Sequence, residues 1–375
     1  MDIYKKEALI MGTFDKYKLK DNPFRMYPAS ESDKLIWAGF RAVKEAFENR
    51  IKRSIGVSNS SLVLNMGEYG SGKTHAAMYF SKPDVLKGLT PTGAKPPLSI
   101  RIDFPSSKNV VYDLYMQVID KLDFKNIQTQ LPTVDERIRT ISLLTKNEFI
   151  KKILELVFCK EVDTDTVSFM YGNASATQRK TLDMPRAINF SVDTEQILGA
   201  IFTFLTSETG PYSCIILWLD EFEDINSLSS VEVKNANAFI RSLLDNTPDH
   251  LLMFINFTMS SLSTREDLFM YLQEAVKSRV KQRIEFELPT LEDLKDYLKD
   301  LLNNHVYRDE AMADFFPFDE DVVEALYTTV RNVSLRRFNE ALSLLLESAC
   351  YDNKEVIDKT YFESIKSEVE GWKDE

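Results

Sequence analysis

Residues 61–74, SLVLNMGEYGSGKT, decide which fold this 375-residue chain is expected to have. The apolar run from Leu62 to Met66 predicts a short buried strand, a glycine-rich turn follows it, and the next residues, HAAMYF, are typical of a helix. The turn matches the phosphate-loop pattern G-x-x-x-x-G-K-[ST] in the setting of strand, turn and helix that the pattern requires. We therefore expect a nucleotide-binding loop, with a chance glycine turn as the alternative.

Each part of this loop has an expected task. The glycines let backbone N–H groups curl around phosphate oxygens, and the helix start adds its positive dipole end. Lys73 is expected to reach the β- and γ-phosphates, and the Thr74 hydroxyl to ligate Mg²⁺. His75 is expected to be chiefly a helix residue. The predicted nucleotide-binding set is Gly67, Gly70, Ser71, Gly72, Lys73, Thr74 and His75.

Composition indicates a globular protein of two or three domains. Hydrophobic residues make up 44% and charged residues 28% of the chain, which is ordinary usage. The longest apolar run, Cys214–Leu219, is far shorter than the about 20 residues of a membrane span, and the N-terminus lacks a signal-peptide pattern. Three scattered cysteines and three histidines favour neither a disulfide framework nor a zinc cluster. We expect a cytoplasmic protein without membrane contact.

The net charge of -12 argues against a generic nucleic-acid coat. A local basic patch, or a pore built by several subunits, stays compatible with that charge. DNA binding is therefore possible but is not indicated by composition.

Strands and helices alternate up to Pro289, and only helices are predicted after it. Strands are expected at 62–66, 98–104, 214–219, 251–255 and 284–288. Crossover helices between them indicate a five-stranded parallel sheet covered on both faces, an α/β fold. Helices are predicted near 32–52 and 110–122, and finally at 291–304, 319–331, 334–350 and 357–370.

We divide the chain into three parts. Residues 1–50 form an N-terminal extension with the first helix, residues 51–289 the α/β nucleotide-binding domain, and residues 290–375 an all-helical domain. Residues 123–210 separate a helix from the next strand by an unusually long stretch. This stretch is expected to be a helical insertion within the α/β domain.

A second motif ends the third predicted strand. Six apolar residues run directly into Asp220 and Glu221, and an acidic residue at the carboxyl end of a central parallel strand is expected beside the phosphate loop. Asp220 is expected to hold Mg²⁺ through water, and Glu221 to polarise the water that attacks the γ-phosphate. The alternative is an acidic turn after a buried strand.

Three more polar residues are candidates by position. Asn256 is expected to end the fourth strand and orient the attacking water, unless it only forms a turn, and Thr258 is the nearby competitor for this role. Arg279 ends the helix before the last strand and is a candidate arginine finger for a neighbouring subunit, with Arg283 as the alternate; the helix dipole alone also favours a cation there. Arg336 follows the helix cap Ser334, where a cation opposes the dipole unless an anion is near. We expect Arg336 to contact bound nucleotide.

In this order, the motifs resemble those of the AAA+ ATPases: GEYGSGKT, IILWLDE, a strand ending at Asn256, Ser278-Arg279, and SLRRFNEAL in a helical lid. The segments NPF, LDEFEDI and SLRRFNEAL look most like the origin-recognition-complex clade and its bacterial relatives. The resemblance implies a AAA+ sheet with a C-terminal lid, ATP and Mg²⁺ as cofactors, and a homo-oligomer assembled through the nucleotide site. Two departures are the long segment between Thr74 and Asp220 and the expected lack of the winged-helix domain of the clade's initiators.

The leading hypothesis is an ATP hydrolase that acts as an oligomerising switch or loader. ATP is favoured over GTP because the chain contains no N-K-x-D motif. The expected setting is prokaryotic DNA metabolism or defence against phages and mobile elements, with a nuclease or another effector protein as partner. Two alternatives stay open: a nucleotide-gated module that recruits a partner through residues 123–210 with little hydrolysis, and a small-molecule kinase.

Overall fold

The computed structural model describes residues 14–25, 28, 33–259, 270–330 and 334–370. Contacts within the chain divide it into two compact units. The α/β unit comprises residues 46–66 and 80–285, and the helical unit comprises the described residues of 1–45, 67–79 and 286–375. The segment with the predicted phosphate loop, 67–79, therefore groups with the helical unit.

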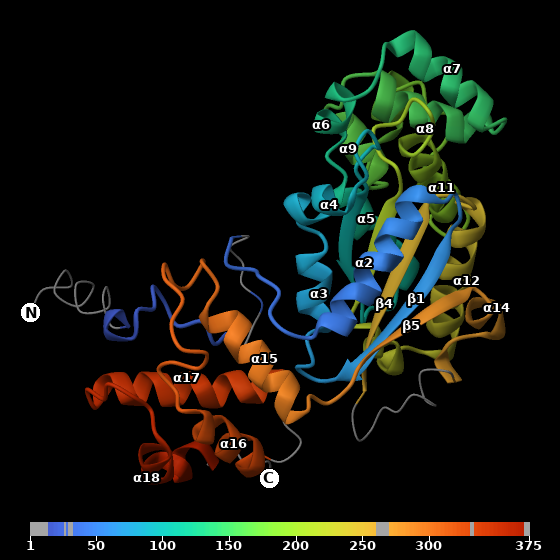
Figure 1. Cartoon of the computed structure of the whole chain (residues 1–375). Coiled ribbons are helices and arrows are strands. Elements are labelled where there is room, and N and C mark those ends of the chain that lie inside the picture. The colour runs from blue at the N-terminus through green and yellow to red at the C-terminus, as the bar shows by residue number, and fades with distance from the viewer. Residues whose placement is uncertain (1–13, 26–27, 29–32, 260–269, 331–333, 371–375) are drawn as a thin grey trace, which may run out of the picture. The chain divides into compact units, whose positions relative to one another are not determined.

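A five-stranded, all-parallel sheet forms the centre of the α/β unit, which confirms the predicted fold class. Its strands are ordered β2-β3-β4-β1-β5 (Figure 1). Their bounds are β1 Ser61–Glu68, β2 Leu98–Asp103, β3 Ile215–Asp220, β4 Leu251–Met259 and β5 Val280–Phe286. Two predicted ranges were wrong in detail, because β4 continues well past Ile255 and β5 begins and ends earlier than expected. Neighbours that are not consecutive in the chain require the crossover connections that the alternating pattern predicted.

The register of the central strands aligns their carboxyl ends. Asp103 is the partner of Asp220, so β2 and β3 end side by side, and Leu219 is the partner of Ile255 in β4. All six residues of β3 are buried, as expected for a central parallel strand with helices on both faces. The acidic residues that end β2 and β3 therefore lie side by side at the carboxyl end of the sheet.

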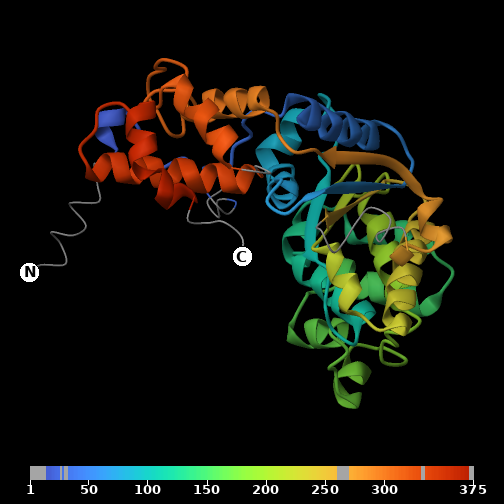
Figure 2. The same cartoon turned by 90° about the horizontal axis from the view of Figure 1, so that it is seen from below.

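Helices cover both faces of the sheet. On one face, Trp218 of β3 stacks on Phe254 of β4 with ring centres 4.1 Å apart, and Phe47 of helix α2 lies 5.8 Å from Trp218. On the other face, α5, α11 and α12 share one hydrophobic core with the sheet, and Figure 2 shows the blue α2 and the yellow α12 on opposite sides. The bounds are α2 Arg41–Gly56, α4 Pro83–Leu89, α5 Val110–Lys121, α11 Thr194–Leu205, η2 Phe222–Ser227, α12 Ser230–Asn246 and α14 Glu274–Lys277.

The predicted insertion is helical, and its buried side chains belong to the same core as the sheet. Its helices lie at the end of the sheet where the strands begin (Figure 1). Thr140 of α7 contacts Thr209, and Lys95, just before β2, donates to the carbonyl oxygens of Ser207 and Glu208. These contacts place α7 and the residues after α11 near the starts of β2 and β3. Its helices are α6 Phe124–Thr129, α7 Val134–Leu144, α8 Glu148–Cys159, α9 Thr164–Met170 and α10 Ala176–Thr181.

Four helices of the helical unit enclose a second hydrophobic core. Thr290 and Ser334 accept backbone N–H bonds and cap two of these helices, which satisfies donors that a helix start leaves open. The four predicted C-terminal helices are confirmed. They are α15 Leu291–Leu302, α16 Glu320–Thr329, α17 Leu335–Tyr351 and α18 Lys359–Glu370.

The N-terminal segment packs on these helices instead of forming a separate extension. Tyr17, in the short helix η1 (Asp15–Tyr17), is fully buried and donates from its hydroxyl to the Lys354 carbonyl oxygen at 2.8 Å. The buried Arg308 donates to the carbonyl oxygen of Tyr17 at 3.2 Å. Asn22, in the NPF segment, donates to Ser343 Oγ of α17 at 2.8 Å. None of these contacts follows from local periodicity.

The first long helix begins later than predicted. α2 starts at Arg41 rather than near residue 32, because Gly39 and Phe40 have φ values of 57° and 46°. A left-handed pair ends any continuous right-handed helix at that point. Within the described part of the chain, no helix has both the length and the apolar character needed to cross a membrane.

Candidate nucleotide site

The glycine-rich loop follows the carboxyl end of β1, and its backbone needs glycine. Gly70 and Gly72 have φ values of +76° and +105°, which side chains rarely adopt. A Cβ on Gly67 would lie 2.6 Å from both Phe286 Cβ and Ser71 Oγ. Helix α3 (Lys73–Tyr79) starts directly after the turn. The strand, turn and helix that the motif requires are therefore all present.

Lys73 is buried and its ammonium group lies within the loop. Lys73 Nζ donates to the carbonyl oxygens of Gly67 and Glu68, both at 2.9 Å, and contacts Ser71 Oγ at 3.3 Å. A buried ammonium carries a large desolvation cost unless it is well solvated by polar groups. The loop thus places a positive charge among its own backbone atoms, where a phosphate group is expected. Thr74 follows in the first turn of α3 and is half-buried.

His75 faces the N-terminal segment. Its Nε2 is 2.8 Å from the carbonyl oxygen of Ile36, and its ring packs edge-on against Trp37 and stacks on Tyr79. Burial lowers the pKa of His75, which favours the neutral ring. These contacts fit the expectation that His75 is chiefly a helix residue.

Arg336 lies against the phosphate loop within the helical unit. Its backbone N–H donates to the carbonyl oxygen of Gly70 at 3.2 Å, and its guanidinium carbon is 4.2 Å from the centre of the Tyr69 ring. Ser334 caps α17 by accepting from the Arg337 N–H at 3.3 Å, as predicted. Sequence reasoning did not single out Tyr69, because its partner is far away in the chain.

Three buried polar side chains connect the central strands of the α/β unit. Asn65 of β1 donates to Asn256 Oδ1 at 2.7 Å, and Asn256 donates to Asp220 Oδ1 at 3.0 Å. Asn256 is fully buried inside β4, which runs on to Met259, so the expectation that it ends the strand was wrong. Asn65 was missed by sequence reasoning, although a polar residue inside the apolar run LVLNM was its signal.

Asp220 has the properties of a ligand for hydrated Mg²⁺. Its side chain is 3% exposed, and among the described residues its Oδ2 accepts no hydrogen bond. The guanidinium of Arg101 lies 3.5 Å from that oxygen and 3.1 Å from Asp103 Oδ1. A buried carboxylate oxygen without a donor is costly, and a metal-bound water would satisfy it. The donor chemistry therefore fits the predicted metal role.

Glu221 has an uncommon backbone conformation for a residue with a side chain. Its φ of 55° is in the left-handed region, which costs on the order of 1–3 kcal/mol and often marks a functional position. The pKa of Glu221 is raised by partial desolvation and then by the nearby carboxylates of Glu223 and Asp220. A raised pKa makes a carboxylate a better proton acceptor. Glu223 is itself fixed, because its Oε2 accepts from the Thr258 N–H at 3.0 Å.

Arg279 follows α14 and pairs with a residue of its own chain. Its guanidinium contacts both carboxylate oxygens of Asp245, at 2.6 and 2.8 Å. The helix predicted before it is only partly seen, since α14 covers Glu274–Lys277 and residues 260–269 lie outside the described range. Arg283, the alternate, is exposed on β5. An arginine finger at position 279 would have to leave Asp245.

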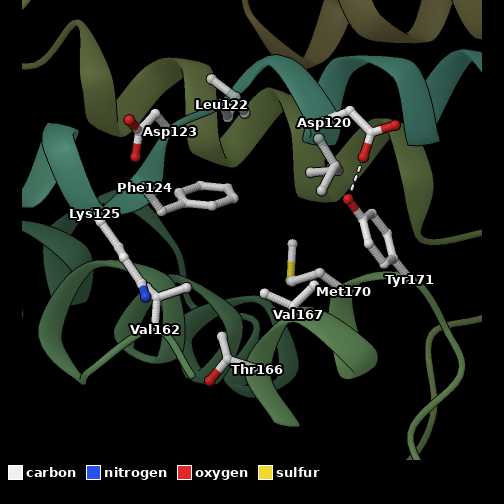
Figure 3. Close-up of a pocket in the computed structure, with 11 residues that line it drawn as sticks. Asp120, Leu122, Asp123, Phe124, Lys125, Val162, Thr166, Val167, Met170 and Tyr171 are labelled. Atoms are coloured by element: carbon white, nitrogen blue, oxygen red, sulfur yellow. Dashed lines mark hydrogen bonds between the residues drawn. The ribbon is translucent and has the colours of Figure 1, made fainter. Parts of the chain in front are cut away.

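A cavity of about 180 Å³ lies within the insertion, between the end of α5 and helix α9 (Figure 3). Phe124, Val162 and Met170 give it apolar walls, and Asp120 accepts a hydrogen bond from the Tyr171 hydroxyl at its rim. The cavity is at the end of the sheet where the strands begin, away from Asp220. It is therefore a separate feature of the α/β unit.

The strand order and the glycine loop define a five-stranded parallel sheet with a phosphate loop after β1, and the motifs on it resemble those of the AAA+ ATPases. Solved structures similar to this chain include ORC proteins and RuvB. Drosophila ORC bound to DNA is 10% identical, with 95% of this chain and 64% of that chain covered and a TM-score of 0.49. Aeropyrum pernix ORC1 in complex with DNA is 14% identical, with 94% and 70% covered and a TM-score of 0.48. The Thermotoga maritima RuvB Holliday junction branch migration motor is 12% identical, with 92% and 76% covered and a TM-score of 0.41.

This chain thus spans less than two thirds of the Drosophila chain. No protein-family model and no curated protein matches the sequence. The function proposed below therefore rests on the residues of the site.

Proposed function

We propose that this chain binds and hydrolyses ATP with Mg²⁺ and acts as an oligomerising switch or loader. The observation that carries the proposal is the buried Asp220 at the carboxyl end of β3. One of its oxygens accepts from Asn256, and the other, 3.5 Å from the Arg101 guanidinium, accepts no hydrogen bond from the residues that the structure describes. It occurs in a chain whose glycine loop holds a buried Lys73. Together these residues supply cation binding and phosphate binding, the two requirements of phosphoryl transfer.

Each residue has a proposed task. The loop N–H groups and Lys73 bind the β- and γ-phosphates, and Thr74 and Asp220 hold the ion, which when bound neutralises charge on the phosphates. Glu221 accepts the proton of the attacking water. We propose that Asn256 chiefly orients the Asp220 carboxylate, to which it donates a hydrogen bond. Positioning of the attacking water is retained as its second role.

Oligomerisation is proposed to complete the site. Arg279 would leave Asp245 and reach the nucleotide of a neighbouring copy, while Arg336 approaches the nucleotide of its own copy from α17. The side chain of Arg279 is 31% exposed, so a neighbour could reach it. Because an arginine that stabilises transition-state charge contributes several orders of magnitude in rate, hydrolysis would depend on assembly.

The biological setting rests on the motif resemblance. We propose prokaryotic DNA metabolism or defence against phages and mobile elements, with DNA or an effector protein such as a nuclease as partner. The three cysteines are free thiols, which is typical of the cytoplasm.

The experiment is a measurement of phosphate release from ATP with and without double-stranded DNA, together with the solution mass with and without ATP. We expect hydrolysis and a larger mass with ATP. Stimulation by DNA would support the DNA setting, whereas an unchanged rate would shift the proposal to a protein partner. A chain that stays monomeric and releases no phosphate would contradict the proposed function.

A second candidate function is a nucleotide-gated recruitment module with little hydrolysis. Its supporting observation is a pair of exposed apolar side chains one turn apart on α7 in the insertion, Val134 and Ile138, which are 44% and 39% exposed. Exposed apolar side chains that lie close together often mark protein contacts. Tight retention of unhydrolysed ATP by a monomer would favour this candidate.

A further inference from the structure

The first turn of α17 and the phosphate loop meet through Arg336, Tyr69 and Gly70. The Arg336 N–H donates to the Gly70 carbonyl oxygen at 3.2 Å, which ties the backbone of the helix start to the loop. The guanidinium carbon of Arg336 then lies 4.2 Å from the Tyr69 ring centre. The approach is close enough that a Cβ on Gly70 would be 2.6 Å from Arg336 Cβ.

The position of Arg336 calls for a compensating group. A cation in the first turn of a helix is opposed by the positive end of the helix dipole. The electron-rich face of Tyr69 offsets part of that repulsion, since a guanidinium over an aromatic ring is attracted to its face. This contact explains how the arginine is held at the loop.

The contact with the ring also bears on which part of Arg336 a ligand meets. A guanidinium is planar, and its N–H donors point outward in that plane. When its face lies on an aromatic ring, the in-plane donors keep the geometry that binds phosphate oxygens. Contact with a ring face restricts the guanidinium without using its N–H donors.

We propose that Tyr69 is a positioning residue that holds Arg336 in the orientation in which it contacts nucleotide phosphates. The inference deepens the proposed function and rests on it, because it assumes that Arg336 binds the nucleotide. Tyr69 acts through its ring and not through its hydroxyl group. The 66% exposure of Tyr69 means that it contributes little to the core, so its replacement leaves the fold intact.

The test is calorimetric titration of the full chain with the nonhydrolysable analogue AMPPNP and Mg²⁺. We expect Tyr69→Leu to weaken binding by roughly two- to fivefold, the size of an exposed cation–π contact, and Tyr69→Phe to bind as wild type. In an Arg336→Met background, Tyr69→Leu is expected to have no further effect. Tyr351→Leu replaces a 92% exposed tyrosine of α17 and is the matched control.

The outcomes separate this inference from the proposed function. Wild-type affinity in Tyr69→Leu, or an equal loss with and without Arg336, would overturn the role of Tyr69. In either case, weaker binding by Lys73→Ala would leave the nucleotide site standing. If the wild-type chain binds no AMPPNP, that result contradicts both the proposed function and the role of Tyr69.

Discussion

Asn256 donates from its side-chain amide to Asp220 Oδ1 at 3.0 Å, and both side chains are buried. The Oδ1 atom of Asn256 accepts a hydrogen bond from the side-chain amide of Asn65. The orientation of the Asp220 carboxylate is thus fixed by Asn256 of β4, and the orientation of Asn256 by Asn65 of β1. Orientation of a metal-binding carboxylate by a second residue tunes its affinity for the ion.

Asn256→Leu is expected to destabilise the chain and to weaken its use of Mg²⁺. The change leaves the buried Asn65 amide without this acceptor, which costs about 1–3 kcal/mol. Asp220 Oδ1 loses the Asn256 donor and keeps the Glu221 N–H at 3.1 Å, so the carboxylate is less firmly oriented. Urea unfolding measures the first effect, and the Mg²⁺ dependence of ATP binding measures the second. Asn173→Leu, at an exposed position, is the control; equal behaviour of the two variants would contradict the assigned role.

Gly70→Ala is expected to weaken nucleotide binding at least roughly tenfold, because the new methyl group meets both backbone strain and Arg336 Cβ. Gly93→Ala is a matched control, since Gly93 has a similar φ of +84° but no atom within 4 Å of its added Cβ. Gly93→Ala should therefore lose stability without losing affinity for AMPPNP. Similar affinities for the two variants would show that close approach of α17 to the loop is unimportant.

Arg279→Ala is expected to abolish hydrolysis while ATP binding persists. Because the arginine acts on a neighbour, mixing Arg279→Ala with Lys73→Ala should restore activity: the second variant supplies the arginine, and the first supplies the intact loop. Phosphate release by the mixture, compared with the sum of the separate variants, is the measurement. A mixture that only equals the sum would place Arg279 outside the active site, in its pair with Asp245.

Asp193→Asn is expected to destabilise the insertion in a pH-dependent manner. Arg186 donates to Asp193 Oδ1 at 2.9 Å and the Asn189 N–H donates to Oδ2 at 2.8 Å, and these bonds hold the pKa of Asp193 below its ordinary 3.8. A carboxyl group whose folded pKa is lowered stabilises the fold above its unfolded pKa, and this stabilisation is lost as the pH falls through the folded pKa.

The free energy of unfolding of Asp193→Asn should thus be about 1–3 kcal/mol lower than that of wild type at pH 7. The gap should narrow below pH 4, where the unfolded aspartate is protonated. Urea titrations at both pH values measure it. A gap that does not depend on pH would contradict the ion pair with Arg186.

Much of the fold was predictable because its signals are local. The run 61–74 contains its own strand, turn and helix start, and the apolar stretch before Asp220 can only be a buried strand or a buried helix segment. The crossover order then indicated a parallel sheet. The start of α2 was missed because Gly39 and Phe40 adopt left-handed φ values. Phenylalanine rarely adopts such values, so the sequence gives no sign of them at position 40.

The contacts that tune the site were not predictable, because their partners are distant in the chain. Asn65 and Asn256 are 191 residues apart, and the ring of Tyr69 meets an arginine of α17. Sequence periodicity shows that a residue faces the core, but it does not show which side chain from another part of the chain it contacts there. The packing of the N-terminal segment on α17 was missed for the same reason.

The most direct test of the central claim is steady-state phosphate release from ATP by wild type, Lys73→Ala and Glu221→Gln. We expect hydrolysis by wild type alone, with Glu221→Gln still binding ATP and Lys73→Ala binding little. Lys121→Ala and Glu161→Gln, two exposed positions, should match wild type. Indistinguishable rates for wild type, Lys73→Ala and Glu221→Gln would contradict the claim that this loop and this carboxylate form an ATP-hydrolysing site.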